Sequence, residues 1–171
     1  MEAGTGSGPA SITYRSHRPG DLGMMVHRHG VIYLDEVGCE DSRFESHMAQ
    51  IAATFLASHD SAKERCWIAE QNNQFIGSIM LIKDPDFEDA ANLRAFLVEP
   101  KARCLGVGKR LVRLCIDYAR KVGYKRVRLR TDCSFTAARS LYRREGFTLV
   151  ETMGEKLFDF EQGGEVWEMV F

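Results

Sequence analysis

The stretch VEPKARCLGVGKRL (residues 98–111) decides the fold. It begins at the end of an apolar run typical of a strand, which Pro100 terminates, and after Gly108 the apolar residues recur at helical spacing. We therefore predict a strand that passes through a glycine-bearing turn into a helix. Such a turn suits an anion, because the first N–H groups of a helix have no partner and the helix dipole favours negative charge there. Glycine also lets the backbone come close to a ligand.

The basic residues are concentrated around this stretch. Residues 101–144 contain 14 Lys or Arg and two acids, whereas residues 1–100 contain eight Lys or Arg and 15 acids. The centre of the chain therefore suits an anionic ligand, and the acidic first part suits a cationic second substrate. Each single charge is equally well explained as part of a solvated face of a helix or strand.

Length and composition indicate one ordinary globular domain. The chain has 171 residues, of which 44% are hydrophobic and 27% charged, and we expect the domain to span residues 11–171. Residues 1–10 lack the basic and apolar regions of a signal peptide and are expected to form a flexible tail. The five cysteines include no CxxC pair, which favours free thiols in the cytoplasm over disulfides or a metal site. No apolar run is long enough to cross a membrane.

Apolar periodicity and turn residues predict the remaining elements. Helices are expected at residues 21–29, where Gly30 bends or interrupts the helix, and at 41–58, 106–122 and 136–145. Strands are expected at residues 11–15, 65–70, 75–82, 92–98, 126–131, 147–152 and 165–171. Their order predicts an α/β fold with a mixed sheet of about seven strands, flanked by about four helices.

Two other phosphate-binding loops are excluded by single residues. A nucleotide-binding P-loop requires Gly where Arg103 stands and Ser or Thr where Arg110 stands, so magnesium would lack its hydroxyl ligand. The dinucleotide pattern GxGxxG requires a third glycine where Leu111 stands.

The sequence resembles the GCN5-related N-acetyltransferases, the GNAT family. The family's phosphate motif is Arg or Gln, two residues, Gly, one residue, then Gly or Ala, and RCLGVG (residues 103–108) matches it. LYRREGF (residues 141–147) matches the Tyr-x-x-x-Gly-Phe pattern that follows in the family. The resemblance covers residues 11–171 and extends to a bacterial subgroup sometimes fused to MarR-type regulators, although no such DNA-binding domain is seen in this sequence.

The resemblance implies a mostly antiparallel GNAT-like sheet and acetyl-CoA as co-substrate, with no metal. The residues that it places against acetyl-CoA lie at the strand end, in the loop and on the later helix: Leu97, Val98, Arg103, Cys104, Gly106, Val107, Gly108, Lys109 and Ala138. Two residues depart from the family pattern. Cys104 stands where Gly is commonest, which is tolerable if its φ is negative, and Phe135 stands where many members have Asn.

Tyr142 matches the family's general-acid position. Acetyl transfer requires a neutral amine, a polarised thioester carbonyl and a stabilised leaving thiolate. A thiol has a reference pKa near 8.5 and a phenol near 10, so a tyrosine can protonate the thiolate without a large mismatch. The alternative role for Tyr142 is that of a core aromatic beside Phe147.

The general base is left open by the sequence. Glu99 ends a strand and is expected to face solvent or the loop, and Asp132 lies at the sheet's opening or caps the next helix. His27, His29 and Tyr33 lie on the first helices, which line the acceptor pocket in this family. A chain of water molecules to solvent serves equally well as a route for the proton.

The function predicted from these features is transfer of an acetyl group to a primary amine of a small molecule or peptide, by direct attack in a ternary complex. The alternative is a catalytically silent, acyl-CoA-binding regulatory module. Nucleic-acid binding is disfavoured, because the basic residues alternate along a strand and surround a helix without forming one aromatic-studded face. In related proteins the final strands support a homodimer.

Overall fold

The computed structural model describes residues 11–171, so the tail expected for residues 1–10 lies outside the described part. The helices are α1 (Asp21–Val37), α2 (Ser42–Ser58), η1 (Pro100–Ala102), α3 (Val107–Lys121) and α4 (Thr136–Glu145). The strands are β1 (Ile12–Ser16), β2 (Arg65–Gln71), β3 (Gln74–Lys83), β4 (Ala90–Val98), β5 (Arg126–Asp132), β6 (Thr148–Met153) and β7 (Gly164–Val170). The predicted order of elements is confirmed, with the short helix η1 added before the turn.

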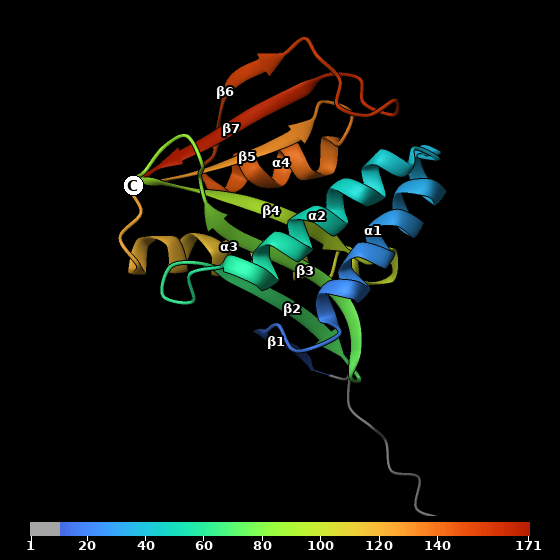
Figure 1. Ribbon diagram of the computed structural model, residues 1–171, viewed down its shortest axis with the longest axis horizontal. Helices are drawn as coiled ribbons and strands as arrows, with labels where there is room; N and C mark the ends of the chain where they lie inside the picture. Colours follow the sequence, from blue (N-terminus) through green and yellow to red (C-terminus); the bar gives the residue numbers. More distant parts are fainter. Residues whose placement is uncertain (1–10) are drawn as a thin grey trace, which may run out of the picture.

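The seven strands form one sheet in the order β1-β2-β3-β4-β5-β7-β6. The β4–β5 pair is parallel and the other neighbours are antiparallel, which confirms the mixed, mostly antiparallel sheet. Helices α1 and α2 cover one face and α3 and α4 cover the other (Figure 1). No helix within residues 11–171 combines the length and apolar character needed to span a bilayer.

Each face of the sheet has its own hydrophobic core. On the α3 side, Leu111, Val112 and Cys115 are fully buried against apolar residues of the central strands. On the α1–α2 side, Met25 and Phe55 pack against the opposite side chains of the same strands. The alternation of side chains across a strand explains why central strands such as β3 read as continuous apolar runs.

Helix α1 does not stop at Gly30, and the expected interruption there is wrong. The helix continues to Val37 and ends at Gly38, whose φ is +67°. Its buried residues include Met25, His29 and Ile32, so the apolar face continues beyond the glycine. A glycine in a helix interior costs about 1 kcal/mol, and burial of a single large apolar side chain, worth about 1.5–3 kcal/mol, outweighs that cost.

Strand β4 separates from β5 after the first three of its nine residues. The two strands pair only where Ala90–Asn92 face Arg126–Arg128. In the β3–β4 pair, Ser78 is opposite Leu97 but Met80 is opposite Arg94, so β4 carries one residue more than β3 over this span. This bulge bends β4 and opens the sheet.

The bulge places Ala95 in an unusual conformation that the sequence analysis does not predict. Ala95 has a φ of +48°, which is uncommon for a residue with a Cβ. The hydroxyl of Ser78 donates a hydrogen bond of 2.9 Å to the carbonyl oxygen of Ala95, and both residues are buried. A bond between two positions far apart in the sequence therefore holds the bulge in place.

Gly77 allows helix α3 and β4 to pack closely on β3. A Cβ at this position would lie 2.9 Å from the carbonyl oxygen of Leu97 and 3.2 Å from the side chain of Leu111. The backbone oxygen cannot move without disturbing the β3–β4 pairing beside the bulge. The absence of a side chain at Gly77 is therefore a requirement of the fold.

We expect Gly77→Ala to lower the free energy of unfolding by about 1–3 kcal/mol, as other overpacked cores do. Gly23→Ala is the matched control, because a Cβ there meets no atom within 4 Å and alanine favours the α1 helix by about 1 kcal/mol. Urea denaturation of both variants measures the difference. Equal stability of the two variants would contradict the packing requirement at Gly77.

Candidate active site

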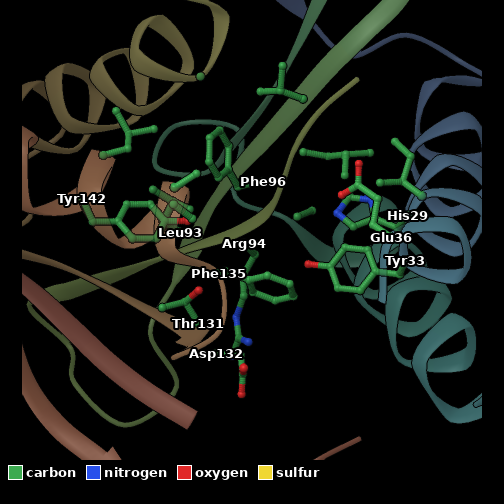
Figure 2. Close-up of a pocket in the computed structure, with 18 of the residues that line it drawn as sticks. His29, Tyr33, Glu36, Leu93, Arg94, Phe96, Thr131, Asp132, Phe135 and Tyr142 are labelled. Atoms are coloured by element: carbon green, nitrogen blue, oxygen red, sulfur yellow. The ribbon is translucent and has the colours of Figure 1, made fainter. Parts of the chain in front are cut away.

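A cavity of about 1160 Å³ lies where β4 and β5 separate. Its walls come from β4, the turn before α3, the end of β5, α4, the first two helices and residues 157–161. Figure 2 shows Tyr142 on one side of this cavity and Tyr33 on the other, with Arg94 and Phe135 between them. The cavity therefore joins the predicted phosphate loop to helices α1 and α2.

All of the residues predicted to contact acetyl-CoA line this cavity: Leu97, Val98, Arg103, Cys104, Gly106, Val107, Gly108, Lys109 and Ala138. Gly106 precedes α3 with a φ of +80° and no side-chain cap. Beyond Arg103, Arg110 is the first residue whose backbone amide donates a hydrogen bond to a carbonyl oxygen of the described residues, that of Gly106. The earlier amides of the helix start remain available to an anion.

Gly108 keeps the start of α3 close to β4. A Cβ there would lie 3.2 Å from the ring of Phe96 and 3.5 Å from the side chains of Val98 and Leu141. A side chain at this position would press against the residues that line the cavity. Glycine therefore leaves room for the helix start to face the space between β4 and α4.

Cys104 adopts the left-handed conformation, with a φ of +64°. The condition under which the sequence makes this cysteine tolerable, a negative φ, is therefore not met. A single residue with a Cβ in this conformation costs roughly 1–2 kcal/mol relative to its preferred geometry. The local cost explains why glycine suits this place in the turn.

Arg103 is fixed by contacts on both sides of the turn. Its Nε donates to the carbonyl oxygen of Val98 at 3.3 Å, and its guanidinium pairs with Glu36 of α1 at 2.7 Å. This ion pair joins the phosphate loop to the first helix, which sequence spacing does not reveal. Glu36 is also the single acidic residue among described residues 11–100 that lines the cavity, so the acidic character of that segment supplies no unpaired acid there.

Tyr142 is buried, with 4% of its surface exposed, yet it lines the cavity. Its ring lies 6.1 Å from that of Phe96 and 5.9 Å from that of Phe147. Its hydroxyl makes no hydrogen bond to any residue in the described part of the chain. The side chain therefore packs as a core aromatic and also leaves its hydroxyl free.

Burial raises the pKa of Tyr142 far above the usual value for a phenol, with a smaller contribution from Tyr33. The small difference in pKa between a phenol and a thiol that the reference values suggest therefore does not hold for Tyr142 in the folded protein. The hydroxyl keeps its proton throughout the working pH range and acts as a neutral hydrogen-bond donor. A thiolate in the same sheltered space is also destabilised, which raises its proton affinity toward that of the phenol.

Glu99 does not face solvent or the loop, as the sequence suggested. It is 6% exposed, and both carboxylate oxygens accept hydrogen bonds from Arg28 of α1, at 2.5 and 2.9 Å. It is not among the residues that line the cavity. A carboxylate paired in this way and outside the cavity is badly placed to take a proton from a bound amine.

Asp132 lines the cavity but its carboxylate is fully engaged. One oxygen accepts from the amide and hydroxyl of Ser134, at 3.0 and 2.5 Å, and the other accepts from the amides of Gln162 and Gly163, at 2.9 and 2.8 Å. Burial disfavours the charged form, but these hydrogen bonds outweigh it and hold the pKa of Asp132 below its usual range. The residue anchors the end of β5 to the segment before β7.

The three residues expected to bind substrate occupy different places. His27 is exposed and lies outside the cavity. His29 is buried in its wall, where burial lowers the pKa of the ring to about 4, and its Nδ1 lies 2.8 Å from the carbonyl oxygen of Met25. Burial raises the pKa of Tyr33 to about 12. His29 and Tyr33 are thus neutral at pH 7 and both line the cavity.

An aromatic cluster forms the wall opposite the phosphate loop, and the sequence analysis does not predict it. Its members come from α1, α2, the start of α4 and the segment before β7: Tyr33, Phe44, Phe135, Phe158 and Phe160. The rings of Tyr33 and Phe44 stack at 4.4 Å, and Tyr33 meets Phe135 edge to face at 5.6 Å. Phe135 therefore adds apolar surface at a position where the family often has a polar amide.

Comparison with known proteins agrees with this geometry. Residues 32–147 match the Acetyltransferase (GNAT) family. N-acetyltransferase family 8 member 3 from Rattus norvegicus is 33% identical over 118 residues, which are 67% of this chain and 49% of that protein. The chain thus spans about half the length of this curated relative.

Solved structures share the fold. A GNAT-family acetyltransferase from Staphylococcus aureus Mu50 has a TM-score of 0.75 at 18% identity, covering 94% of this chain and 99% of that one. A protein from Bacillus anthracis, provisionally named a streptothricin acetyltransferase and solved in complex with acetyl coenzyme A, has a TM-score of 0.57 at 28% identity. It covers 64% of this chain and 63% of its own.

The chain belongs to the GNAT family, which is a family of acyltransferases. Membership of this family makes three features functional candidates: the separation of β4 from β5, the start of α3 after Gly106, and Tyr142 in the cavity wall. Within residues 11–171, no three His, Cys, Asp or Glu side chains are arranged to hold a metal ion.

Replacement of Cys104 tests the strain in the phosphate loop. We expect Cys104→Gly to leave the melting temperature unchanged or higher, because glycine adopts a positive φ without a steric penalty. Cys104→Val should be less stable than wild type by about 1–2 kcal/mol, since a β-branched residue is a poor fit to this conformation. Calorimetry of both variants gives the comparison. A valine variant as stable as the glycine variant would rule out strain at this position.

Replacement of Asp132 tests its anchoring role and has a defined pH dependence. We expect Asp132→Asn to lower the free energy of unfolding at pH 7 by about 1–3 kcal/mol, because the amide NH₂ faces donors that the carboxylate accepted. A depressed folded-state pKa contributes stability above the unfolded pKa, near 3.8, and this contribution is lost as the pH falls further. The gap between wild type and variant should therefore narrow below about pH 4 in urea denaturation. A gap that stays constant between pH 7 and pH 3 would argue against this role.

Proposed function

We propose that this protein is an acetyl-CoA-dependent N-acetyltransferase that acts on a primary amine of a small molecule or peptide. The observation that carries this proposal is the free hydroxyl of Tyr142, which lies in the cavity where β4 and β5 separate. A hydroxyl that borders a cavity and makes no hydrogen bond to the described residues is available to a bound ligand, which supports a role in the reaction.

The residues around the phosphate loop fit acetyl-CoA. The free amides of the α3 start and the side chain of Lys109 suit its phosphates, and the edge of β4 at Leu97 and Val98 faces the opened space where the pantetheine arm would lie. When bound, acetyl-CoA supplies the activated acetyl group as a thioester. The acetyl coenzyme A complex of the Bacillus anthracis protein, which is 28% identical to this chain, supports the assignment.

Tyr142 is proposed to act on the leaving sulfur. Its hydroxyl holds a proton at every working pH because burial raises its pKa. It can therefore donate a hydrogen bond as negative charge develops, and transfer the proton once the thiolate in the sheltered cavity has become sufficiently basic. The Tyr142 ring packs against the rings of Phe96 and Phe147. These contacts fix the orientation of its hydroxyl, the hydrogen-bond donor.

The acceptor amine is proposed to enter from the side of α1 and α2 and to attack directly in a ternary complex. Glu99 is paired with Arg28, and Asp132 accepts four hydrogen bonds. His29 has a pKa of about 4 and is too weak a base to hold a proton from an ammonium ion. We therefore infer that water carries the proton from the amine to solvent.

Several finer attributes belong to the same proposal. The five cysteines are all free within the described residues, which is consistent with a cytoplasmic location. A homodimer through the final strands and membership of the bacterial subgroup related to MarR-fused proteins remain predictions from the resemblance.

The second candidate function is the catalytically silent acyl-CoA-binding module. Binding of acetyl-CoA without release of CoA thiol across a panel of amines would favour that module.

We expect Tyr142→Phe to lower kcat by about 100-fold or more, the usual contribution of a general acid. Because the phenyl ring remains, the dissociation constant of acetyl-CoA should change little. Steady-state release of CoA thiol and calorimetric titration with acetyl-CoA measure the two quantities.

Tyr124→Phe is the matched control for this experiment. Tyr124 is also buried and its hydroxyl is also unpaired, but it does not line the cavity. We expect its removal to leave kcat at the wild-type value. Unchanged turnover in Tyr142→Phe, or an equal loss in both variants, would remove Tyr142 from the proposed chemistry.

A further inference from the structure

Arg94 is a partly buried cation that lines the cavity without a partner. It lies on β4 one residue before Ala95 and the bulge. Its guanidinium forms no hydrogen bond and no ion pair with any residue between 11 and 171. By contrast, Arg103 pairs with Glu36 at 2.7 Å and Arg130 pairs with Glu161 through two hydrogen bonds, at 2.8 and 3.1 Å.

The carboxylates near this end of the cavity are already used. Both oxygens of Asp132 accept two hydrogen bonds each. Glu161 holds Arg130 and also accepts from the backbone amide of Leu157 at 2.6 Å. Neither residue has an acceptor oxygen to spare for Arg94. Asp84 favours the charged form of Arg94 through its negative charge, but among the described residues it accepts from the amides of Asp86 and Phe87 and pairs with Arg128, and not with Arg94.

The surroundings of Arg94 make the unpaired charge costly. Burial lowers the pKa of Arg94, the positive charge of Arg130 acts in the same direction, and the negative charge of Asp84 opposes them with a smaller effect. A guanidinium nevertheless keeps its charge in proteins. His47 of α2 does not offset the charge, because burial and the two arginines lower its pKa and favour its neutral form. An arriving anion would therefore recover much of the cost of leaving this cation without a partner.

We propose that Arg94 binds a carboxylate of the acceptor, so that the substrate is an amine that also carries a carboxylate group. The inference rests on the proposed function for the amine that receives the acetyl group. A guanidinium presents two parallel N–H groups that match one carboxylate. A phosphate, which has more charge, would need further unpaired cations, and Arg130 beside it is already neutralised by Glu161.

The aromatic cluster defines the rest of this substrate. The cluster members Tyr33, Phe44, Phe135, Phe158 and Phe160 line the same cavity as Arg94. Figure 2 shows Arg94 next to Phe135, with Tyr33 beyond it. Apolar and aromatic walls beside one charged group are typical of small-molecule sites, where the polar group fixes orientation. The acceptor is therefore an amino acid with a large apolar or aromatic side chain.

A binding experiment tests this inference without relying on turnover. We would titrate CoA-saturated protein with pairs of N-acetylamino acids and their C-terminal amides, with side chains from valine to phenylalanine and tryptophan. Wild type should bind the acids at least 10-fold more tightly than the amides. Arg94→Gln should lose this preference, and Arg94→Lys should keep part of it because the positive charge remains.

Arg120→Gln is the control, because Arg120 is exposed on α3 outside the cavity, and it should bind like wild type. The melting temperature of Arg94→Gln should equal or exceed that of wild type, since removal of an unpaired buried charge relieves a cost to the fold. If wild type shows no preference for any acid over its amide, or if Arg94→Gln retains the preference, the inference is overturned.

Initial rates of CoA release with the free amino acids and their amides then separate the two proposals. Transfer to the amino acids, lowered 10-fold or more in kcat/KM by Arg94→Gln with no change in the KM of acetyl-CoA, supports both. Preferential binding of the acids without transfer to any amine overturns the proposed function and leaves the role of Arg94 intact. Equal transfer to acids and amides in wild type supports the proposed function and overturns the role of Arg94.

Discussion

The structure depends on the extra residue that β4 accommodates against β3. Ser78 donates a hydrogen bond to the carbonyl oxygen of Ala95 and thereby holds that residue at a positive φ. The bend that results limits the pairing of β4 with β5 to three residues at its start. Without it, the parallel pair could continue, and the space between the phosphate loop and helices α1 and α2 would close. The bulge therefore converts a continuous sheet into one with a reaction chamber.

The charges inside that chamber follow a simple pattern. Glu36, Glu161 and Asp132 are each satisfied by an arginine or by several hydrogen bonds. The hydroxyl of Tyr142 and the guanidinium of Arg94 line the same cavity without a hydrogen-bond partner among residues 11–171. Polar groups in a cavity wall that have no protein partner remain available to a ligand. Tyr142 suits a leaving group and Arg94 suits part of a substrate, so the proposed chemistry and the proposed selectivity belong to different residues of one cavity.

Local sequence patterns were sufficient wherever the controlling physics was local. The boundaries of α4 and the end of α3 follow from Gly146 and Gly123, which adopt positive φ. Patterns failed where distant residues decide the outcome. Gly30 does not interrupt α1, because the buried face of the helix continues to Ile32. Glu99 at the end of a strand reads as exposed, and only the approach of Arg28 from α1 buries it.

The sequence by itself determined the family, the sheet flanked by helices and the residues of the phosphate loop, because these depend on hydrophobic periodicity and on glycines at fixed spacing. The tertiary structure alone decided the positive φ of Cys104, the bulge at Ala95, the aromatic wall and the isolation of Arg94. Each of these depends on contacts between residues that are far apart in the sequence, and the spacing of residues along the chain does not reveal those contacts. A charge near a turn is visible in the sequence, but whether it has a partner is a property of the folded molecule.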